Sequence, residues 1–413
     1  MGAARGREAW AENGGTMQRT ADAVLVGAGV MGASVAFHLA RRGVRQVLVL
    51  EKTGIAAGAT GKSAAFIRMH YTNEPEARMA IASFPIFQQW ADAVGGDCGF
   101  TRTGFVMTVL PEDADALRRN VAMLQRLGAE TEVLTPADLK AAAPALATED
   151  LILAAYEPES GYADPVATTR AFLDRAQALG ARLEVGAEVL ALRVRAGRIS
   201  GVETTRGPVD APTVILLTGP WTPRLLRTAG SDLPITPKRA QIATFGRPAA
   251  LAAGHPMVID GAVGSYFRPT RDNLTLVGVG LWDGKGPVDP DTYDQANDPE
   301  FLSVARRKLA RRLPAMGDAP YVRGHAGIYD MSPDTRAILD EVPTVRGLFV
   351  AAGFSGTGFK KAPAVGACLS ELILDGRART VDLRPFRWSR YAENDPIRGP
   401  NEYRLPAEFG HRI

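Results

Sequence analysis

The sequence predicts an α/β protein in which a parallel-sheet domain is assembled from distant segments and a second, α+β domain contains an antiparallel sheet. Continuous apolar runs at 23–26, 47–51, 214–219 and 347–353 predict the first domain, because such runs are typical of strands covered on both faces. Strand-like runs at 242–245, 265–268 and 274–279 predict the second.

The composition is that of an ordinary globular chain and excludes several classes of partner. Of 413 residues, 46% are hydrophobic and 23% are charged, and the net charge is only +3. Basic residues are scattered and do not interleave with aromatics, so we expect no nucleic-acid partner. Apolar runs stay below the roughly 18 residues that a membrane helix needs, so we expect no membrane span. Residues 1–20 lack the apolar centre of a signal peptide, and we expect a disordered leader on a cytoplasmic protein.

Cysteine and histidine spacing gives no support for metal chemistry. The two cysteines, Cys98 and Cys368, cannot form a disulfide framework, and neither has metal-ligand spacing. The five histidines are far apart and form no H-x-x-x-H or H-x-E pattern. We therefore expect no metal and a reducing compartment.

A glycine motif follows the first strand pattern and opens a helical one. It consists of Gly27, Gly29 and Gly32, with Glu51 at the tip of the next strand. The first glycine permits a tight turn, the second admits a pyrophosphate, and the third lets the helix pack on the strand. Glu51 can accept hydrogen bonds from a ribose diol. The motif predicts a Rossmann-like βαβ unit that binds a dinucleotide.

The remaining elements follow from local periodicity. Helical patterns are predicted at 33–40, 114–127, 136–143 and 362–374. The segment 159–181 combines a strand end with another helix, and strands are predicted at 184–194 and 199–205. The hydrophobic pattern of residues 76–153 is typical of amphipathic helices. The last forty residues are rich in Pro, Arg and Tyr and are expected to wrap the surface.

The order of these elements favours FAD over NAD. An NAD dehydrogenase usually devotes its N-terminal half to one uninterrupted doubly wound sheet. Here the buried strands return late in the chain, after helical and antiparallel insertions, which suits a glutathione-reductase-type FAD domain built from discontinuous segments. We place the FAD-binding domain at 21–95, 156–225 and 321–380, the substrate or cap domain at 96–155 and 226–320, and a C-terminal surface tail at 381–413.

Several sequence blocks carry a resemblance that covers nearly the whole chain. Besides the glycine motif they are Gly-Ala-Thr-Gly-Lys-Ser at 58–63, Arg-Met-His-Tyr at 68–71, Thr-Gly-Pro-Trp at 218–221, Gly-Ile-Tyr-Asp-Met-Ser-Pro-Asp at 327–334 and Gly-Phe-Ser-Gly-Thr-Gly-Phe-Lys at 353–360. With these blocks the chain resembles the D-amino-acid oxidase superfamily of flavoenzymes, in its sarcosine oxidase β-subunit-like and glycine oxidase-like branch. The resemblance implies FAD as cofactor and oxidation of an amine or amino acid at a CH–NH bond.

The 353–360 block also has a physical rationale. When a flavin accepts a hydride, negative charge develops at one edge of its ring. A glycine-rich turn that feeds a helix N-terminus presents backbone N–H groups and a positive dipole end to that charge, and Lys360 adds a point charge. A plain strand-to-helix turn with a solvated lysine is the alternative.

The resemblance also implies candidate catalytic residues. Arg68 and Lys360 match the residues that hold the substrate carboxylate in the family, and arginine offers a bidentate fork for that purpose. Tyr266 lies in a run similar to the family's substrate wall, although an aromatic residue in a strand is usually core. His70 and His325 are further candidates, with a packing role as the alternative for each.

Candidate cofactor-binding residues come from the same blocks and their neighbours. They are Gly27, Gly29, Val30, Met31, Gly32, Glu51, Lys52, Thr60, Lys62, Ser63, Val189, Thr218, Gly219, Gly327, Tyr329, Gly353, Ser355, Gly356, Thr357, Gly358, Phe359 and Lys360.

Two departures from the best-known members bear on the chemistry. Monomeric sarcosine oxidases attach flavin through a cysteine at the position of Gly327, so FAD is expected to be non-covalent here. Those enzymes also carry a lysine that promotes reaction with oxygen on the strand matching 274–279, and this chain has none there. This departure argues against rapid oxidase activity and favours a dehydrogenase with another acceptor as the alternative.

The predicted function is FAD-dependent oxidation of a small secondary or N-methylated amino acid, such as sarcosine, by hydride transfer to flavin N5 and hydrolysis of the resulting imine. The acceptor is oxygen or an electron-transfer partner, and a homodimer or hetero-oligomer is possible. Alternatives are a flavoprotein subunit of an amine dehydrogenase complex and a tailoring amine or imino-acid oxidase of secondary metabolism. A non-catalytic dinucleotide-binding protein is a further alternative, against which Arg68 and Lys360 argue.

Overall fold

The computed structural model describes residues 19–280 and 286–404. Its strands form four sheets within these ranges, of six, eight, four and three strands. The leader predicted at 1–20 lies outside the described residues except for its last two, Arg19–Thr20, which form strand β1 instead.

The six-stranded sheet is built from distant parts of the chain. In spatial order its strands are β10 (Arg182–Val185), β3 (Val47–Glu51), β2 (Ala23–Val26), β14 (Val214–Leu216), β21 (Leu348–Ala352) and β20 (Ile338–Glu341). Neighbours pair in parallel except β20 and β21, which are antiparallel. The predicted α/β fold with a parallel sheet of discontinuous segments is confirmed. Its central strands are almost wholly apolar because both faces of the sheet are covered.

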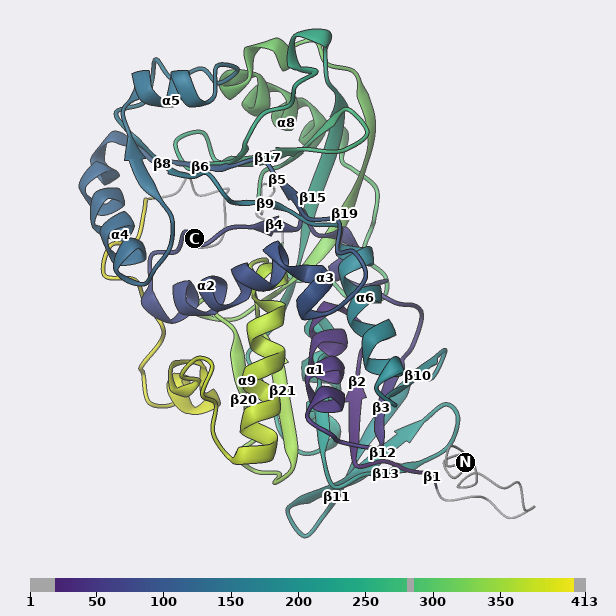
Figure 1. Ribbon diagram of the computed structural model, residues 1–413. Coiled ribbons are helices and arrows are strands. Elements are labelled where there is room, and N and C mark those ends of the chain that lie inside the picture. The colour runs from purple at the N-terminus through teal and green to yellow at the C-terminus, as the bar shows by residue number, and fades with distance from the viewer. Residues whose placement is uncertain (1–18, 281–285, 405–413) are drawn as a thin grey trace, which may run out of the picture.

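Helices cover one face of this sheet and a small sheet covers the other. The helices are α1 (Val30–Arg41), α6 (Pro165–Ala178) and α9 (Ala362–Asp375), which lie side by side in Figure 1. The small sheet has the order β1, β13 (Val209–Asp210), β12 (Arg198–Thr204) and β11 (Val189–Arg195). Apolar side chains of the two sheets form one buried cluster.

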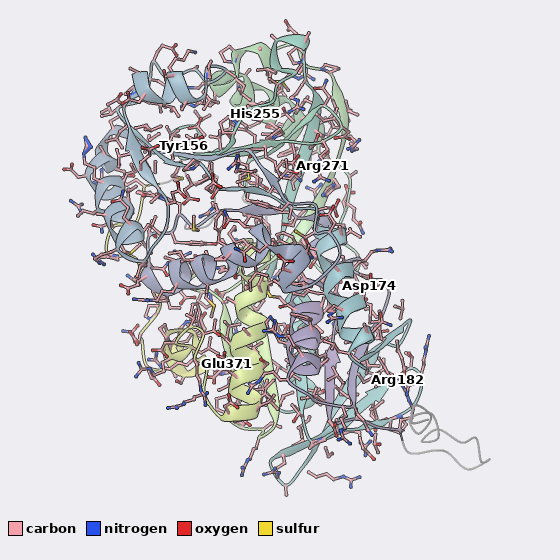
Figure 2. The ribbon with its side chains drawn as sticks, in the orientation of Figure 1. Tyr156, Asp174, Arg182, His255, Arg271 and Glu371 are labelled. Carbon is pink, nitrogen blue, oxygen red and sulfur yellow. The ribbon has the colours of Figure 1, made fainter. Side chains whose placement is uncertain are left out.

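The eight-stranded sheet forms the other half of the molecule. Its order is β19 (Tyr321–Met331), β15 (Thr236–Gly246), β18 (Leu274–Gly278), β17 (Ser265–Pro269), β16 (Met257–Asp260), β6 (Phe105–Thr108), β8 (Ala154–Glu157) and β7 (Glu132–Leu134). All pairs are antiparallel except β16 with β6. Figures 1 and 2 show this sheet, with Tyr156 and His255, at the opposite end of the molecule from β11 and β12.

Helices and a short sheet complete this half and join it to the other. The helices are α2 (Glu74–Gln88), α3 (Trp90–Ala93), α4 (Ala114–Arg126), α5 (Pro136–Ala142) and α8 (Pro299–Arg312). The three-stranded sheet is β4 (Phe66–Ile67), β9 (Gly161–Tyr162) and β5 (Thr101–Arg102). Chain segments from both halves meet in this short sheet, which lies between the two large sheets in Figure 1.

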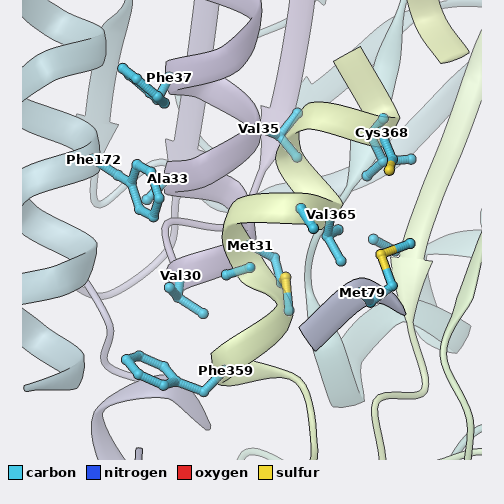
Figure 3. Close-up of a cluster of buried hydrophobic side chains, with 14 of the residues drawn as sticks. Val30, Met31, Ala33, Val35, Phe37, Met79, Phe172, Phe359, Val365 and Cys368 are labelled. Carbon is cyan, nitrogen blue, oxygen red and sulfur yellow. The ribbon is translucent and has the colours of Figure 1, made fainter. Parts of the chain in front are cut away.

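The largest apolar core surrounds α1. Figure 3 shows Val30, Met31 and Phe37 of α1 among side chains of α2, α6 and α9. A Cβ at Gly366 of α9 would lie 2.2 Å from Ser34 Oγ of α1, so glycine is needed for the close approach of these two helices. Each large apolar side chain buried here contributes about 1.5–3 kcal/mol to stability.

Two local predictions of secondary structure were wrong. The predicted strand 184–194 is split between β10 and β11, which belong to different sheets, because the chain turns at Gly186 with φ of +74°. Residues 76–153 were predicted to be helical, but they also contain strands β5, β6 and β7. Strand β19 starts where the last FAD-domain segment was predicted to begin, yet it pairs with β15 of the eight-stranded sheet.

The predicted surface tail is partly buried. Phe386, Arg390 and Ile397 are at most 7% exposed, and Arg390 Nε donates to Asp334 at 2.8 Å. A buried ion pair between residues so far apart in sequence leaves no local pattern, so the tail's composition alone could not predict it.

Two features are absent from residues 19–280 and 286–404. None of their helices has both the length and the apolar character needed to cross a bilayer. The same residues contain no group of three or more His, Cys, Asp or Glu side chains able to hold a metal ion.

Candidate active site

A long cavity connects the two large sheets. At one end it is lined by residues at the carboxyl ends of β2, β3 and β14, including Gly27 and Glu51. At the other end it is lined by side chains of the eight-stranded sheet, including Ile242, Ile259 and Tyr266. Parallel strands place their carboxyl ends at one edge of a sheet, which is the usual location of a ligand site in such folds.

The glycine motif is packed too tightly for any side chain. Gly27 has φ of +108°, and a Cβ there would lie 2.7 Å from the carbonyl oxygen of Leu217. A Cβ at Gly29 would lie 3.0 Å from Thr60 Oγ1, and one at Gly32 would lie 1.9 Å from the Gly27 oxygen. Gly27 and Gly29 line the cavity, whereas Gly32 does not and serves the contact between helix and strand. These placements agree with the separate roles expected for the three glycines.

Glu51 fixes the turn from the next strand. Its Oε2 accepts a hydrogen bond from the backbone N–H of Ala28 at 2.9 Å, and its Oε1 accepts one from the N–H of Thr53 at 2.8 Å. The carboxylate also lines the cavity. It therefore holds the glycine turn in place and faces the space where a ribose is expected.

The cavity lining fits an extended dinucleotide such as FAD. The bare backbone of the glycine turn leaves room for a pyrophosphate, and the cationic side chains of Lys52 and Lys62 line the same cavity. Glu51 supplies an acceptor for a ribose diol. The far end, walled by Ile242 and Ile259, offers apolar surface for an aromatic ring.

The turn after β21 brings a second glycine-rich segment to the cavity. Gly353, Ser355 and Gly356 have φ of +72°, +52° and +84°, and the backbone N–H of Gly353 donates to Asp330 Oδ2 at 2.7 Å. Burial raises the pKa of Asp330 to about 6. A Cβ at Gly356 would lie 2.9 Å from the ring of Tyr329, so the turn packs directly on this tyrosine. Gly353 and Ser355 shape the turn without lining the cavity.

Three cations surround the buried ring of Tyr71. The guanidinium carbon of Arg68 lies 4.6 Å from the ring centroid, Lys361 Nζ lies 4.9 Å away and Lys360 Nζ 5.8 Å away. Arg68 and Lys360 line the cavity and Lys361 does not. The cation–π attraction offsets only part of the repulsion among three buried cations. A bound anion such as a carboxylate would compensate this positive charge.

Arg68 and Lys360 retain hydrogen-bonding capacity for a ligand. Arg68 is 3% exposed, donates to the carbonyl of His70, and has a buried Nε with no partner among the described residues. Lys360 Nζ lies 3.5 Å from the Thr357 carbonyl, a long and weak hydrogen bond. Burial, together with the nearby Arg68 and Lys361, holds the pKa of Lys360 well below its usual value.

Lys361 is held by a carboxylate from α2. Its ammonium donates to Glu76 Oε1 and, at 2.9 Å, to Thr357 Oγ1. Glu76 Oε2 pairs with Arg336 at 3.0 Å and accepts from Asn73 Nδ2 at 3.1 Å. Burial alone would raise the pKa of Glu76, but Arg336 and Lys361 lower it to about 2. This carboxylate is an anchor of the second glycine turn that sequence reasoning missed.

Two tyrosines meet at the wall of the cavity. The hydroxyls of Tyr266 and Tyr329 lie 3.4 Å apart, and the ring of Tyr266 meets Phe66 edge-on with centroids 5.9 Å apart. A Cβ at Gly278 would lie 2.2 Å from Tyr266 Cζ, so this glycine makes room for the ring. Both tyrosines line the cavity, as the sequence analysis expected.

The two predicted histidines do not line the cavity. His70 is fully buried behind Arg68, and its Nε2 lies 2.8 Å from the hydroxyl of Tyr403. His325 Nε2 contacts the Lys62 carbonyl at 3.3 Å. The packing alternative therefore describes both better than a direct role in catalysis. The contact with Tyr403, from the predicted surface tail, was not expected.

Most of the predicted cofactor-binding residues line the cavity. They are Gly27, Gly29, Val30, Met31, Glu51, Lys52, Thr60, Lys62, Ser63, Val189, Thr218, Gly219, Gly327, Tyr329, Gly356, Thr357, Gly358, Phe359 and Lys360. Lining residues that the prediction missed include Phe66, Trp221, Arg224, Ile242 and Ile259. Trp221 belongs to the 218–221 block and could have been predicted from the sequence. Ile242 and Ile259 could not, because nothing in the sequence marks them except their place among strand-like residues.

Comparisons with known proteins agree with this geometry. The model of the family described as FAD dependent oxidoreductase matches residues 22–372. The chain is 29% identical to FAD-dependent oxidoreductase domain-containing protein 1 of Xenopus laevis, over 91% of this chain and 84% of that protein. It is 27% identical to glycine oxidase of Geobacillus kaustophilus, over 90% and 97% respectively. The crystal structure of L-proline dehydrogenase from P. horikoshii has a TM-score of 0.85 and 28% identity, over 92% of this chain and all of that chain.

Proposed function

The chain belongs to the family of FAD dependent oxidoreductases, and from this premise we propose that its substrate is a small secondary or N-methylated amino acid such as sarcosine. The general activity of the protein is FAD-dependent oxidation of an amino acid at its C–N bond. The observation that carries the proposal is the pair of buried cations, Arg68 and Lys360, in a cavity that also meets the glycine motif.

The two cations suit a substrate with one carboxylate. Arg68 has a buried Nε with no partner among the described residues, and a planar guanidinium binds a carboxylate through two parallel hydrogen bonds. Lys360 adds a second donor without a strong partner of its own. Holding the carboxylate in this way orients the amine end of the substrate, and such orientation can lower a barrier by several kcal/mol.

The remaining wall suits a small and uncharged amine. Phe66, Tyr266 and Ile259 line the cavity near these cations, and an apolar wall disfavours an ammonium ion. The neutral amine is the form that can lose a hydride from its adjacent C–H bond. Bound FAD supplies the acceptor for these two electrons. Hydrolysis of the resulting imine then needs only water.

Residues of the two glycine-rich segments are the proposed FAD ligands. The first segment and Glu51 would hold the pyrophosphate and a ribose, and the turn at 356–358 with Lys360 would face the ring. We propose that the cofactor is not attached through a cysteine, because both cysteines, Cys98 and Cys368, are buried away from the cavity lining.

A second candidate, a dehydrogenase with an acceptor other than oxygen, is favoured by one specific observation. Strand β18 (Leu274–Gly278) is wholly buried and carries no cation. The similarity to L-proline dehydrogenase, whose substrate is a secondary amino acid, supports the same alternative. Comparing turnover with oxygen and with an artificial dye would separate the two.

Anaerobic bleaching of the flavin tests the proposal directly, because it needs no knowledge of the acceptor. The panel is sarcosine, dimethylglycine, proline, glycine and D-alanine, with the carboxyl-free amine dimethylamine as control. We expect bleaching by sarcosine or another secondary or N-methylated amino acid and none by the control. Bleaching by dimethylamine as fast as by sarcosine would contradict the carboxylate clamp, and bleaching by primary amino acids alone would contradict the substrate class.

A further inference from the structure

Residues 288–298 form a strap on the outer side of the cofactor cavity. At its centre, the carboxylate of Asp291 accepts hydrogen bonds from Lys52 Nζ at 2.5 Å, Trp221 Nε1 at 2.8 Å and Arg224 NH1 at 2.5 Å. All three donors line the cavity, and Asp291 does not. One carboxylate therefore ties together three side chains of the cavity wall from outside.

The three donors come from opposite sides of the glycine turn. Lys52 directly follows β3, whereas Trp221 and Arg224 lie in the short helices η3 (Gly219–Trp221) and α7 (Thr222–Thr228) after β14. Strands β3 and β14 flank β2, which ends in the glycine turn. The link from Lys52 through Asp291 to Arg224 therefore bridges the two walls between which the dinucleotide phosphates are expected.

A second contact lies further along the strap. Lys62 Nζ donates to the hydroxyl of Tyr293 at 2.5 Å and to Gln295 Oε1 at 2.6 Å, and it lies 4.9 Å from the centroid of the Tyr293 ring. Lys62 also lines the cavity, at the end of the short helix η1 (Thr60–Lys62). The strap thus holds side chains from three separate segments of the cavity wall.

The base of the strap is fixed to the eight-stranded sheet. Arg239 of β15 is 8% exposed and donates to the carbonyl of Asp294 at 2.8 Å, to that of Ala296 at 2.5 Å and to the carboxylate of Asp298 at 2.9 Å. A buried arginine with three acceptors makes this end rigid. The Asp291 end is open to solvent, since the side chains of Lys52, Asp291 and Arg224 are 28%, 35% and 54% exposed.

We propose that the 288–298 strap is a latch that retains FAD, and that Asp291 closes it by joining the two walls of the cavity. The rigid base and the solvent-exposed tip allow the tip to detach while the base stays bound. Exposed ion pairs weaken in salt, so the latch opens more often at high ionic strength. The inference concerns cofactor retention and holds whichever amino acid is oxidised.

The test is the rate of FAD release from the full-length holoprotein after dilution, followed by the fluorescence of the released flavin. We expect Asp291→Ala to release FAD about tenfold faster, which corresponds to the loss of two exposed ion pairs and one hydrogen bond. Tyr293→Phe should give a smaller acceleration. Raising the salt concentration should accelerate release from the wild type more than from Asp291→Ala, because the variant lacks the two short ion pairs of Asp291 and keeps only the longer Arg224–Asp289 pair, at 3.5 Å, to be screened.

Asp272→Ala is the matched control. Asp272 is also an exposed aspartate, 2.5 Å from Arg323, and neither residue lines the cavity. Its release rate should stay within about twofold of the wild type. The latch is overturned if Asp291→Ala releases FAD at the wild-type rate or more slowly, or if Asp272→Ala accelerates release as much. Because no substrate is added, the result does not depend on the proposed substrate class.

Discussion

The ammonium of Lys361 is bound by the carboxylate of Glu76, and the two side chains are 2% and 0% exposed. Lys360, the preceding residue, lines the cavity, and among the described residues its one hydrogen-bond partner is the Thr357 carbonyl, at 3.5 Å. Two adjacent lysines thus have different environments, because only one of them meets a buried anion. Glu76 neutralises Lys361, whereas Lys360, whose pKa is lowered by burial and by the nearby Arg68 and Lys361, is available to a ligand in its protonated form.

Replacing Glu76 should destabilise the fold strongly. Glu76→Gln leaves the buried cations Lys361 and Arg336 without their shared carboxylate, and breaking a buried pair costs about 3–5 kcal/mol. Lys361→Met should cost less, because Glu76 then keeps Arg336 and Asn73. The free energy of unfolding, measured by urea denaturation, checks this order.

Glu74→Gln is the control for that comparison. Glu74 is on the same helix, 44% exposed, and pairs with Arg78 one turn away. Its loss should cost less than about 0.5 kcal/mol. Equal costs for Glu74→Gln and Glu76→Gln would show that the buried cluster contributes nothing specific.

Carboxylate binding should depend on pH through Lys360. The neighbouring charges are Arg68 and Lys361, which lower the pKa of Lys360 together with burial, and Glu76 and Glu157, which raise it less. A carboxylate ligand favours the protonated lysine, so its affinity is full below this lowered pKa and falls as pH rises through it. Because one proton is involved, the affinity for the carboxylate cannot fall more than tenfold per pH unit. Titration of the flavin spectrum with a non-oxidisable carboxylate such as acetate, at several pH values, measures it.

Lys360→Met separates this effect from other titrations. The variant should bind the carboxylate weakly at all pH values, lose this pH dependence, and keep FAD. If the variant showed the wild-type pH dependence, the titrating group would be another residue. Loss of FAD instead would mean that Lys360 mainly holds the cofactor and not the substrate carboxylate.

Gly278 should be intolerant of any side chain. A Cβ there would lie 2.2 Å from Tyr266 Cζ, so Gly278→Ala must displace the ring. Overpacking of this kind costs about 1–3 kcal/mol. Because Tyr266 lines the cavity, we expect the KM for the amino acid to rise about tenfold while FAD stays bound.

Gly317→Ala is the control for Gly278→Ala. Its Cβ would meet only the Pro314 carbonyl, at an ordinary contact distance of 3.5 Å, far from the cavity lining. We expect KM to stay at the wild-type value. If KM is also unchanged in Gly278→Ala, Tyr266 does not form part of the wall around the bound substrate.

Mild acid should destabilise the protein at a pH above the range in which most of its carboxylates titrate. Burial lowers the pKa of His38 and His70 to about 3 and that of His255 to about 4, so these histidines are neutral when folded and take up protons near pH 6.5 when unfolded. Their contribution to stability is present above pH 6.5 and is lost as pH falls through that value. Asp330, whose pKa burial raises to about 6, opposes this by one proton.

The net effect is an uptake of about two protons on unfolding between pH 6 and pH 5, or roughly 2–3 kcal/mol lost over that interval. Urea denaturation at both pH values measures this loss of stability. In His255→Gln the loss should be smaller, because unfolding then takes up about one proton fewer. Stability that stays constant from pH 6 to pH 5 would contradict the burial of these neutral histidines.

The local sequence was sufficient to predict a feature wherever the physical requirement for that feature lies within one segment. The glycine turn after β2 requires residues without side chains, and Glu51 follows at the tip of the next strand, so both were predictable together with the parallel sheet and most of the cofactor lining. The family resemblance added Arg68 and Lys360, and the structure brings both to one cavity. It also added His70 and His325, which the structure leaves outside the lining.

By itself, then, the sequence determined the α/β fold class and the dinucleotide motif, because periodicity and glycine spacing are local properties, and its resemblance to a known family pointed to Arg68 and Lys360. Only the tertiary structure decided that Glu76 neutralises Lys361, the neighbour of the predicted Lys360, and that Asp291 bridges Lys52 and Arg224. These relations join residues more than 60 positions apart in the chain. The energy of a buried or shared charge depends on which groups the fold brings within a few ångströms, and no local pattern encodes that distance.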